Sequence, residues 1–196
     1  MRKASWAVAV ILGVAPALFA QEPAVERASI WTDTVKHGNM QVMVRGRGVL
    51  GANKTAELKI PEDLMKQVAV GQLASIDTGK GIIQGKVARV GQAEAVVELE
   101  GALPESARPG LAVDGTIHMG TLNGIAYVGR PVLCRLNAED SIFKLERDGK
   151  HAARVKVQYG KGSVNLVEVR GGLEAGDRVI LSDMSAYKGQ DRVRVE

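Results

Sequence analysis

The chain has 196 residues, a hydrophobic fraction of 45% and a formal net charge of +4. This length is enough for one sizeable domain or two small ones with a buried core. The charge is far from the concentrated basic stripe of a nucleic-acid-binding protein, and we expect no nucleic-acid partner. Twenty-three glycines and an aromatic fraction of 4% favour short strands and tight turns over a helical bundle.

Residues 1–20 are predicted to be a secretory signal peptide. Arg2 and Lys3 precede an apolar run over 6–19, and Ala20 suits the cleavage site. The run is shorter than the about 20 residues that span a bilayer, although retention as an inner-membrane anchor is the alternative. We therefore expect a periplasmic protein, with a flexible leader over 21–30.

The next part of the chain predicts a β-barrel domain over 52–120. An N-terminal strand over 31–50 precedes it and ends in a glycine-rich turn. After an alternating strand, Pro61 begins one short helix, predicted over about 61–70, because proline suits the first helical position. Alternating or apolar runs bounded by turn residues predict five strands, at 55–60, 73–77, 82–90, 95–99 and 111–119.

A second β-rich block is predicted over 121–196. Asp148 and Gly149 suit the tight type I′ turn of a hairpin, and a turn is predicted over 160–162. Strands are predicted at 142–146, 153–159, 163–170, 178–181 and 192–195. About a dozen short strands at regular spacing are typical of all-β barrels or sandwiches.

Few residues suggest chemistry. The histidines His37, His118 and His151 lie far apart in the sequence without metal-ligand spacing. Cys134, the single cysteine, lies in an apolar context without a nearby base and is read as a small buried hydrophobe. We therefore predict no catalytic residue, no metal site and no cofactor.

Residues 55–120 carry a resemblance to a known family. An alternating strand leads to a proline-started helix, followed by the string VAVGQLASI, a Gly-x-Val strand at Gly85 and the string RPGLAVDG at 108–115. This order resembles the β-barrel domain of periplasmic adaptor subunits, the HlyD/MacA-like membrane fusion proteins. Residues 31–50 resemble the strand that rises into that barrel, and 121–196 resemble the membrane-proximal domain of the family.

The resemblance implies a non-enzymatic subunit of an efflux system. Its partner would be an inner-membrane permease of the ABC (MacB-like) or RND type. Copies of the chain would pack side by side as a homo-oligomer, peripheral to the membrane. Adaptors usually carry lipoyl half-motifs and an α-helical hairpin that docks on an outer-membrane channel. Here Leu50 leads almost directly to Thr55, so these parts are missing.

Four basic residues of the second block are the candidate partner-binding residues: Arg154, Lys156, Lys161 and Arg170. They could meet acidic transporter loops or lipid head groups, whereas the plain alternative is a solvated strand face. A different functional hypothesis is a free periplasmic β-barrel module that captures a small ligand, lipid or metal in the barrel mouth. An exported hydrolase is a third, and it would need a nucleophile and base that the sequence does not suggest.

Overall fold

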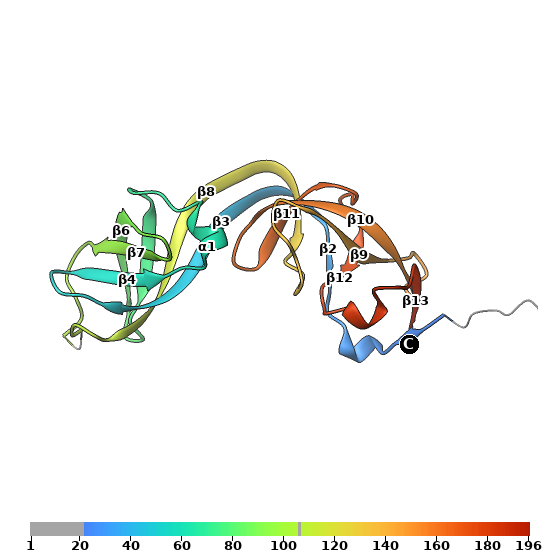
Figure 1. Ribbon diagram of the computed structural model, residues 1–196, viewed down its shortest axis with the longest axis horizontal. Helices are drawn as coiled ribbons and strands as arrows, with labels where there is room; N and C mark the ends of the chain where they lie inside the picture. Colours follow the sequence, from blue (N-terminus) through green and yellow to red (C-terminus); the bar gives the residue numbers. More distant parts are fainter. Residues whose placement is uncertain (1–21, 106) are drawn as a thin grey trace, which may run out of the picture.

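The computed structural model describes residues 22–105 and 107–196. The predicted signal peptide, residues 1–20, lies outside the described residues. The described chain forms thirteen strands, one α-helix and two 3-10 helices, so the predicted all-β class is confirmed. Figure 1 shows two modules at the ends of an arch that the long strands β3 and β8 bridge.

The first module is a closed six-stranded barrel. Its strands follow the order β8-β3-β4-β7-β6-β5, and pairing of β5 with β8 closes the ring. Closure removes free strand edges, and alternating apolar side chains such as Leu58, Ile76 and Ile117 fill the interior without exposure. The strands are β3 Lys36–Leu50, β4 Thr55–Lys59, β5 Leu73–Asp77, β6 Ile82–Val90, β7 Glu94–Leu99 and β8 Ala112–Gly129.

The predicted helix is shorter than expected. Helix α1 covers Glu62–Met65 rather than about 61–70. Pro61 is its N-cap and its carbonyl oxygen accepts the first helical hydrogen bonds, but beyond Met65 the chain continues as single turns toward Gly71. Met65 and Val68 are buried against the barrel core. One turn is enough to close that end of the barrel, and Gly71, at φ +88°, turns the chain toward β5.

Gly48 lets β3 and β4 approach each other closely. A Cβ atom at this position would overlap the carbonyl oxygen of Glu57 and crowd the backbone of Leu58. Any side chain here therefore pushes two hydrogen-bonded strands apart.

We expect Gly48→Ala to lower the free energy of unfolding by about 1–3 kcal/mol, the usual cost of overpacking. Chemical denaturation measures the change. Gly81→Ala is the matched control, because a Cβ there meets nothing within 4 Å and the backbone φ is not positive. An equal effect of the two substitutions would contradict the close approach.

The boundary predicted between the two domains, at 120/121, lies inside a strand. β8 continues without a break from the barrel into the second module, where it pairs with β11 through the register from Ala126 to Gly129. Gly120 and Gly124 have φ values of +115° and +62° in the bridging part of the strand. These glycines interrupt the alternation, which is why the sequence suggested that the strand ends there.

The second module packs apolar side chains on both faces of one sheet. On β9, Ile142 faces a core with Val157 and Val167, whereas its neighbour Phe143 faces a second core with Ile180 and Val193. The strands are β1 Ala24–Val25, β2 Thr32–Thr34, β9 Glu139–Leu145, β10 His151–Gly162, β11 Leu166–Gly171, β12 Arg178–Ile180 and β13 Arg192–Val195. The 3-10 helices are η1 Arg27–Ser29 and η2 Ser185–Tyr187.

The prediction of a flexible leader over 21–30 is wrong for its described residues, which begin at Glu22. β1 pairs in parallel with β13, and Val25 is buried in the same core as Phe143. Val25, Ile30 packed against the same core and the strand hydrogen bonds to β13 hold a segment that is otherwise polar. The short and mostly polar sequence of this segment did not predict its contact with β13.

Two predicted turns also differ from the turns in the structure. β9 and β10 are joined by five residues, 146–150, in which Gly149 has φ +65° while Asp148 does not have positive φ. The loop is therefore not the two-residue type I′ turn. β10 continues through Gly162, so 160–162 are strand rather than turn.

Candidate functional site

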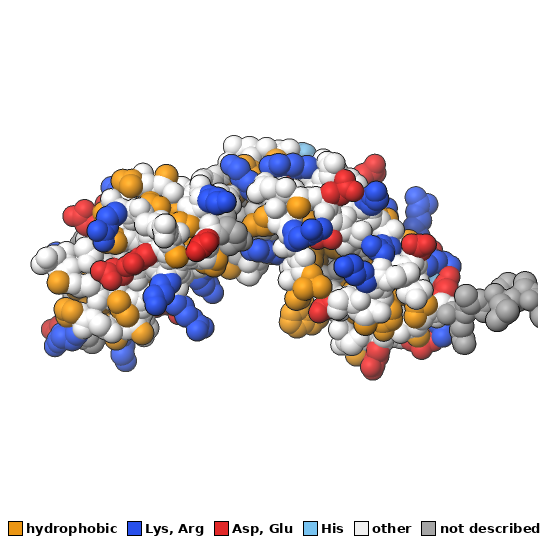
Figure 2. Space-filling model, viewed as in Figure 1, with side chains coloured by type: hydrophobic (Ala, Val, Ile, Leu, Met, Phe, Trp, Pro, Cys, Tyr) orange, Lys and Arg blue, Asp and Glu red, His pale blue; other side chains and the backbone are white. Residues whose placement is uncertain are grey.

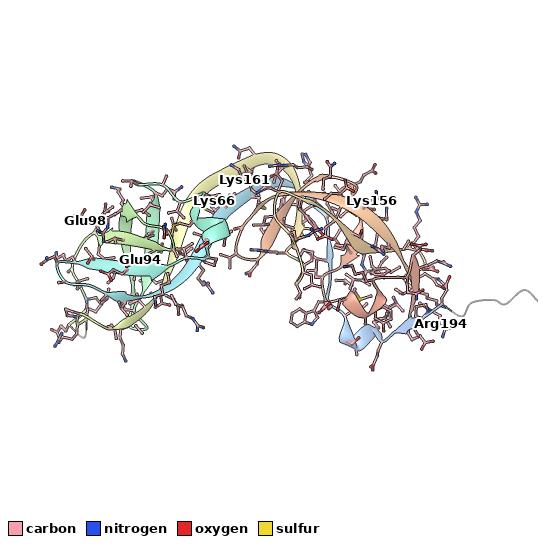
Figure 3. The ribbon with its side chains drawn as sticks, viewed as in Figure 1. Lys66, Glu94, Glu98, Lys156, Lys161 and Arg194 are labelled. Carbon is pink, nitrogen blue, oxygen red and sulfur yellow. The ribbon has the colours of Figure 1, made fainter. Side chains whose placement is uncertain are left out.

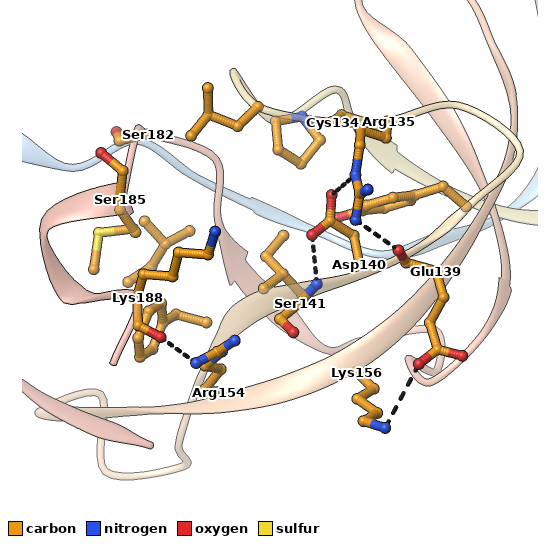
Figure 4. A pocket seen from close by; sticks show the side chains of 17 residues that line it. Cys134, Arg135, Glu139, Asp140, Ser141, Arg154, Lys156, Ser182, Ser185 and Lys188 are labelled. Carbon is orange, nitrogen blue, oxygen red and sulfur yellow. Dashed lines mark hydrogen bonds and ion pairs between the residues drawn. The ribbon is translucent and has the colours of Figure 1, made fainter. Parts of the chain in front are cut away.

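Two of the predicted contact residues lie together. Arg154 and Lys156 are two positions apart on β10, and both line one pocket (Figure 4). The Lys156 Nζ atom lies 3.6 Å from Glu139 Oε1. The Arg154 guanidinium donates a hydrogen bond to the backbone carbonyl oxygen of Lys188.

The other two predicted residues gather around a different acid. The backbone N–H of Lys161 donates to Glu168 Oε2 at 2.8 Å, and Arg170 Nη2 lies 3.2 Å from the same oxygen. Burial raises the pKa of the Glu168 carboxyl, but the Lys161 N–H and the Arg170 guanidinium outweigh it and lower that pKa. Glu168 is therefore ionised at neutral pH.

The four cations do not form one basic cluster. Figure 3 places Lys156 on the body of the second module and Lys161 near the bridge between the modules. On the face in Figure 2, Lys and Arg side chains are interspersed with Asp and Glu over both modules. Mixed charge of this kind affects association rates more than affinity.

The pocket of the second module has a volume of about 590 Å³. It lies between the loop that precedes β9, the strands β9 and β10, and the segment from β12 through η2 (Figure 4). Its lining combines buried apolar side chains with a charged rim: Pro131, Leu133, Cys134, Arg135, Glu139, Asp140, Ser141, Ile142, Phe143, Arg154, Lys156, Tyr159, Ile180, Ser182, Met184, Ser185 and Lys188. Sequence reasoning found Arg154 and Lys156 but not the loops that meet them.

Two titratable groups in the pocket wall stay neutral at physiological pH. Burial, more than the nearby charges of Arg130 and Asp140, raises the pKa of the Cys134 thiol to about 11. Burial likewise raises the pKa of the Tyr159 hydroxyl. A protonated thiol is a poor nucleophile, so Cys134 contributes to packing rather than to reactivity.

A cluster at the β9–β10 loop was missed in the sequence. Ligand-type atoms of Glu146, Asp148 and His151 lie within 4.8 Å of one another. Arg192 from β13 donates to both oxygens of Glu146, at 2.7 and 2.9 Å, and to Glu22 at 2.9 Å. Because the guanidinium pairs with both Glu146 and Glu22, these contacts form an ionic staple between the loop, β13 and the N-terminal segment. The only sequence signal for this cluster was the spacing of the carboxylates Glu146 and Asp148 before His151.

Acid is expected to weaken the Asp148–His151 pair beside this staple. The hydrogen bond from His151, followed by that from the Lys150 backbone N–H, lowers the pKa of Asp148 from 3.8 to about 2. The ionised carboxylate therefore stabilises the folded chain above about pH 4, and this contribution is lost as the pH falls toward 2. Unfolding measured across this range should depend less steeply on pH in Asp148→Asn than in the parent chain. Identical pH dependence of the two proteins would count against this Asp148–His151 pair.

One hydroxyl–imidazole contact occurs on the barrel. Ser75 Oγ lies 3.4 Å from His118 Nε2 and donates to Gln84 Oε1 at 3.0 Å. A working nucleophile needs a base that is itself oriented by a third group. Among the described residues, no such third group is hydrogen-bonded to His118. The contact is an ordinary polar pair on the barrel strands β5, β6 and β8.

No family model and no curated protein matches the sequence. One solved structure with a similar backbone is MacA from Actinobacillus actinomycetemcomitans. The two chains are 16% identical, with a TM-score of 0.44, over 66% of this chain and 42% of the MacA chain. The chain thus spans less than half the length of MacA. At this identity the likeness to MacA concerns the course of the backbone alone.

Proposed function

We propose that the chain is a non-enzymatic, adaptor-like subunit of the membrane fusion protein type. It acts in the periplasm, where copies pack side by side and associate with an inner-membrane permease of the ABC (MacB-like) or RND type. The observation that carries the proposal is the architecture in which β3 and β8 run from a closed barrel into a second β-module. Such a frame offers surfaces rather than a reactive centre.

One motif string of the sequence, at 108–115, falls where two strands of this frame meet. Within 108–115, Gly110 has φ +87°. Its N–H donates to the Leu50 carbonyl oxygen at 2.7 Å, and the Leu50 N–H donates to the Leu111 carbonyl oxygen at 2.8 Å. The motif therefore ties the start of β8 to the end of β3. This gives a structural reason for a proline–glycine turn at that place.

The connection between β3 and β4 supports a shortened form of the adaptor. Only residues 51–54 join the two strands, and Asn53 and Lys54 have φ values of +59° and +56°. We propose that the chain contacts the permease but makes no contact with an outer-membrane channel through this position. Within the part of the chain that the structure describes, no helix has the length and hydropathy of a membrane span.

Photo-cross-linking in the cells that make the protein tests the proposal. A photoreactive residue at position 156, on the exposed side of β10, is expected to capture an inner-membrane permease identified by mass spectrometry. The same residue at position 80, on an exposed turn of the barrel, is the matched control for non-specific capture. A chain that yields no permease adduct at position 156, and that remains monomeric, would contradict the proposal.

A further inference from the structure

The pocket of the second module has the size of a small-molecule site. Its volume of about 590 Å³ falls within the range of about 300–1,000 Å³ that is usual for ligand pockets. The proposed adaptor role uses Lys156 at the rim of this pocket, but not the apolar side chains at its base. Its chemistry can therefore be considered separately.

The base of the pocket is apolar, and so is one part of its entrance, which is called the lip here. Phe143 and Ile180 are almost fully buried at its base, and Met184 is half-buried beside them. Leu133 at the lip is 58% exposed, and the preceding residue, Val132, is 64% exposed. Exposed apolar side chains that continue into a pocket mark a binding surface more strongly than single ones do.

A further exposed apolar residue, Trp31, lies on a neighbouring segment of the module. The Leu181 N–H donates to the Trp31 carbonyl oxygen at 2.7 Å, and the Val132 N–H donates to the Leu181 carbonyl oxygen at 3.0 Å. These bonds place Trp31, which is 75% exposed, on the other side of Leu181 from Val132. Figure 2 shows hydrophobic side chains gathered at the lower edge of this module.

The charges of the rim do not cancel. Arg135 lies 3.4 Å from Asp140, and Lys156 lies 3.6 Å from Glu139. The two remaining cations, Arg154 and Lys188, have no carboxylate oxygen within 4.0 Å among residues 22–105 and 107–196. The hydrogen bond from Arg154 to the Lys188 backbone places the guanidinium beside the Lys188 main chain, and both residues line the same pocket (Figure 4).

We propose that this pocket binds an anionic amphiphile, a single alkyl chain with a carboxylate or phosphate head. The head group pairs with Arg154 and Lys188, whose charges are not neutralised within the protein. The alkyl chain lies along Phe143, Met184 and Leu133. The hydroxyl group of Ser182, which also lines the pocket, accepts from the Trp31 N–H and can donate a further hydrogen bond to the head.

Calorimetric titration of the full chain with decanoate tests the proposal. Acetate supplies the head without the chain, and decyl maltoside supplies the chain without the charge. Decanoate is expected to bind more tightly than both, and to shift the amide NMR signals of Ser182, Ser185 and Lys188. Decyl phosphate distinguishes the two possible head groups. If it binds more tightly than decanoate, the natural ligand has a phospholipid-type head; if it binds more weakly, the ligand is a fatty acid. Equal binding of decanoate and decyl maltoside would overturn the proposal.

Two substitutions locate the contacts. Lys188→Gln should weaken decanoate binding about tenfold, the usual effect of losing one charge-assisted hydrogen bond, whereas Lys80→Gln on the barrel should have no effect. Leu133→Ser should also weaken binding, whereas Leu73→Ser should not, and the two leucines are equally exposed at 58% and 57%. Because all four side chains are exposed, the fold is retained. Equal affinities of the Lys188 and Lys80 variants would exclude this site.

Discussion

Leu58→Ala is expected to lower the free energy of unfolding of the barrel by about 2–5 kcal/mol. Leu58 on β4 is fully buried. Its side chain fills the space above Gly115, where a Cβ atom would overlap both of its methyl groups, and its backbone lies against Gly48. Because glycines have no side chains that could move into the cavity, we expect a loss toward the upper end of this range. Urea denaturation of the two proteins measures it.

The control for this prediction is another leucine of the same barrel. Leu73 on β5 is 57% exposed, so Leu73→Ala should change the free energy of unfolding by no more than about 0.5 kcal/mol. Similar losses in both variants would show that Leu58 does not occupy the packed interior described here.

Phe143→Ala should destabilise the second module by about 3–5 kcal/mol. The Phe143 side chain is 4% exposed and packs with Ile180 and Val193 in the core that also holds Val25. Its loss opens a cavity under the pocket and loosens the attachment of β1. Denaturation followed by circular dichroism gives the size of the effect, and faster proteolysis over 22–30 would report the release of β1.

Leu133→Ala separates the loss of packing from a change in the pocket lining. Leu133 also lines the pocket, but it is 58% exposed, so we expect little loss of stability. If Phe143→Ala were as mild as Leu133→Ala, the core assigned to this face of the sheet would be wrong.

Strands with regular alternation and clear turn residues were predictable. The strands 73–77, 82–90 and 192–195 have the bounds expected from their apolar pattern, because Gly and charged residues mark their ends. β8 was predicted only to 119, although it continues to Gly129. Its bridging part has less regular burial, so periodicity gives no signal there.

The candidate site was less predictable than the fold. Alternation along β10 indicated that Arg154 and Lys156 share a side of the sheet. The pocket, however, also needs Leu133 from one loop and Lys188 from the segment after η2. Such residues are distant in the sequence and meet through tertiary packing alone. The ion pair between Glu22 and Arg192 joins residues near the two ends of the described chain. No local sequence pattern predicts such a contact.

The proposed function depends on two separately packed β-modules that share β3 and β8. Site-resolved hydrogen exchange on Leu58→Ala and Phe143→Ala tests this most directly, because exchange reports local stability along the chain. Leu58→Ala should speed exchange in the barrel, for example at Val97, by about thirtyfold or more, while Val157 and Val193 keep their protection. Phe143→Ala should produce the reverse pattern. Equal acceleration in both modules for either variant would contradict the two-module account.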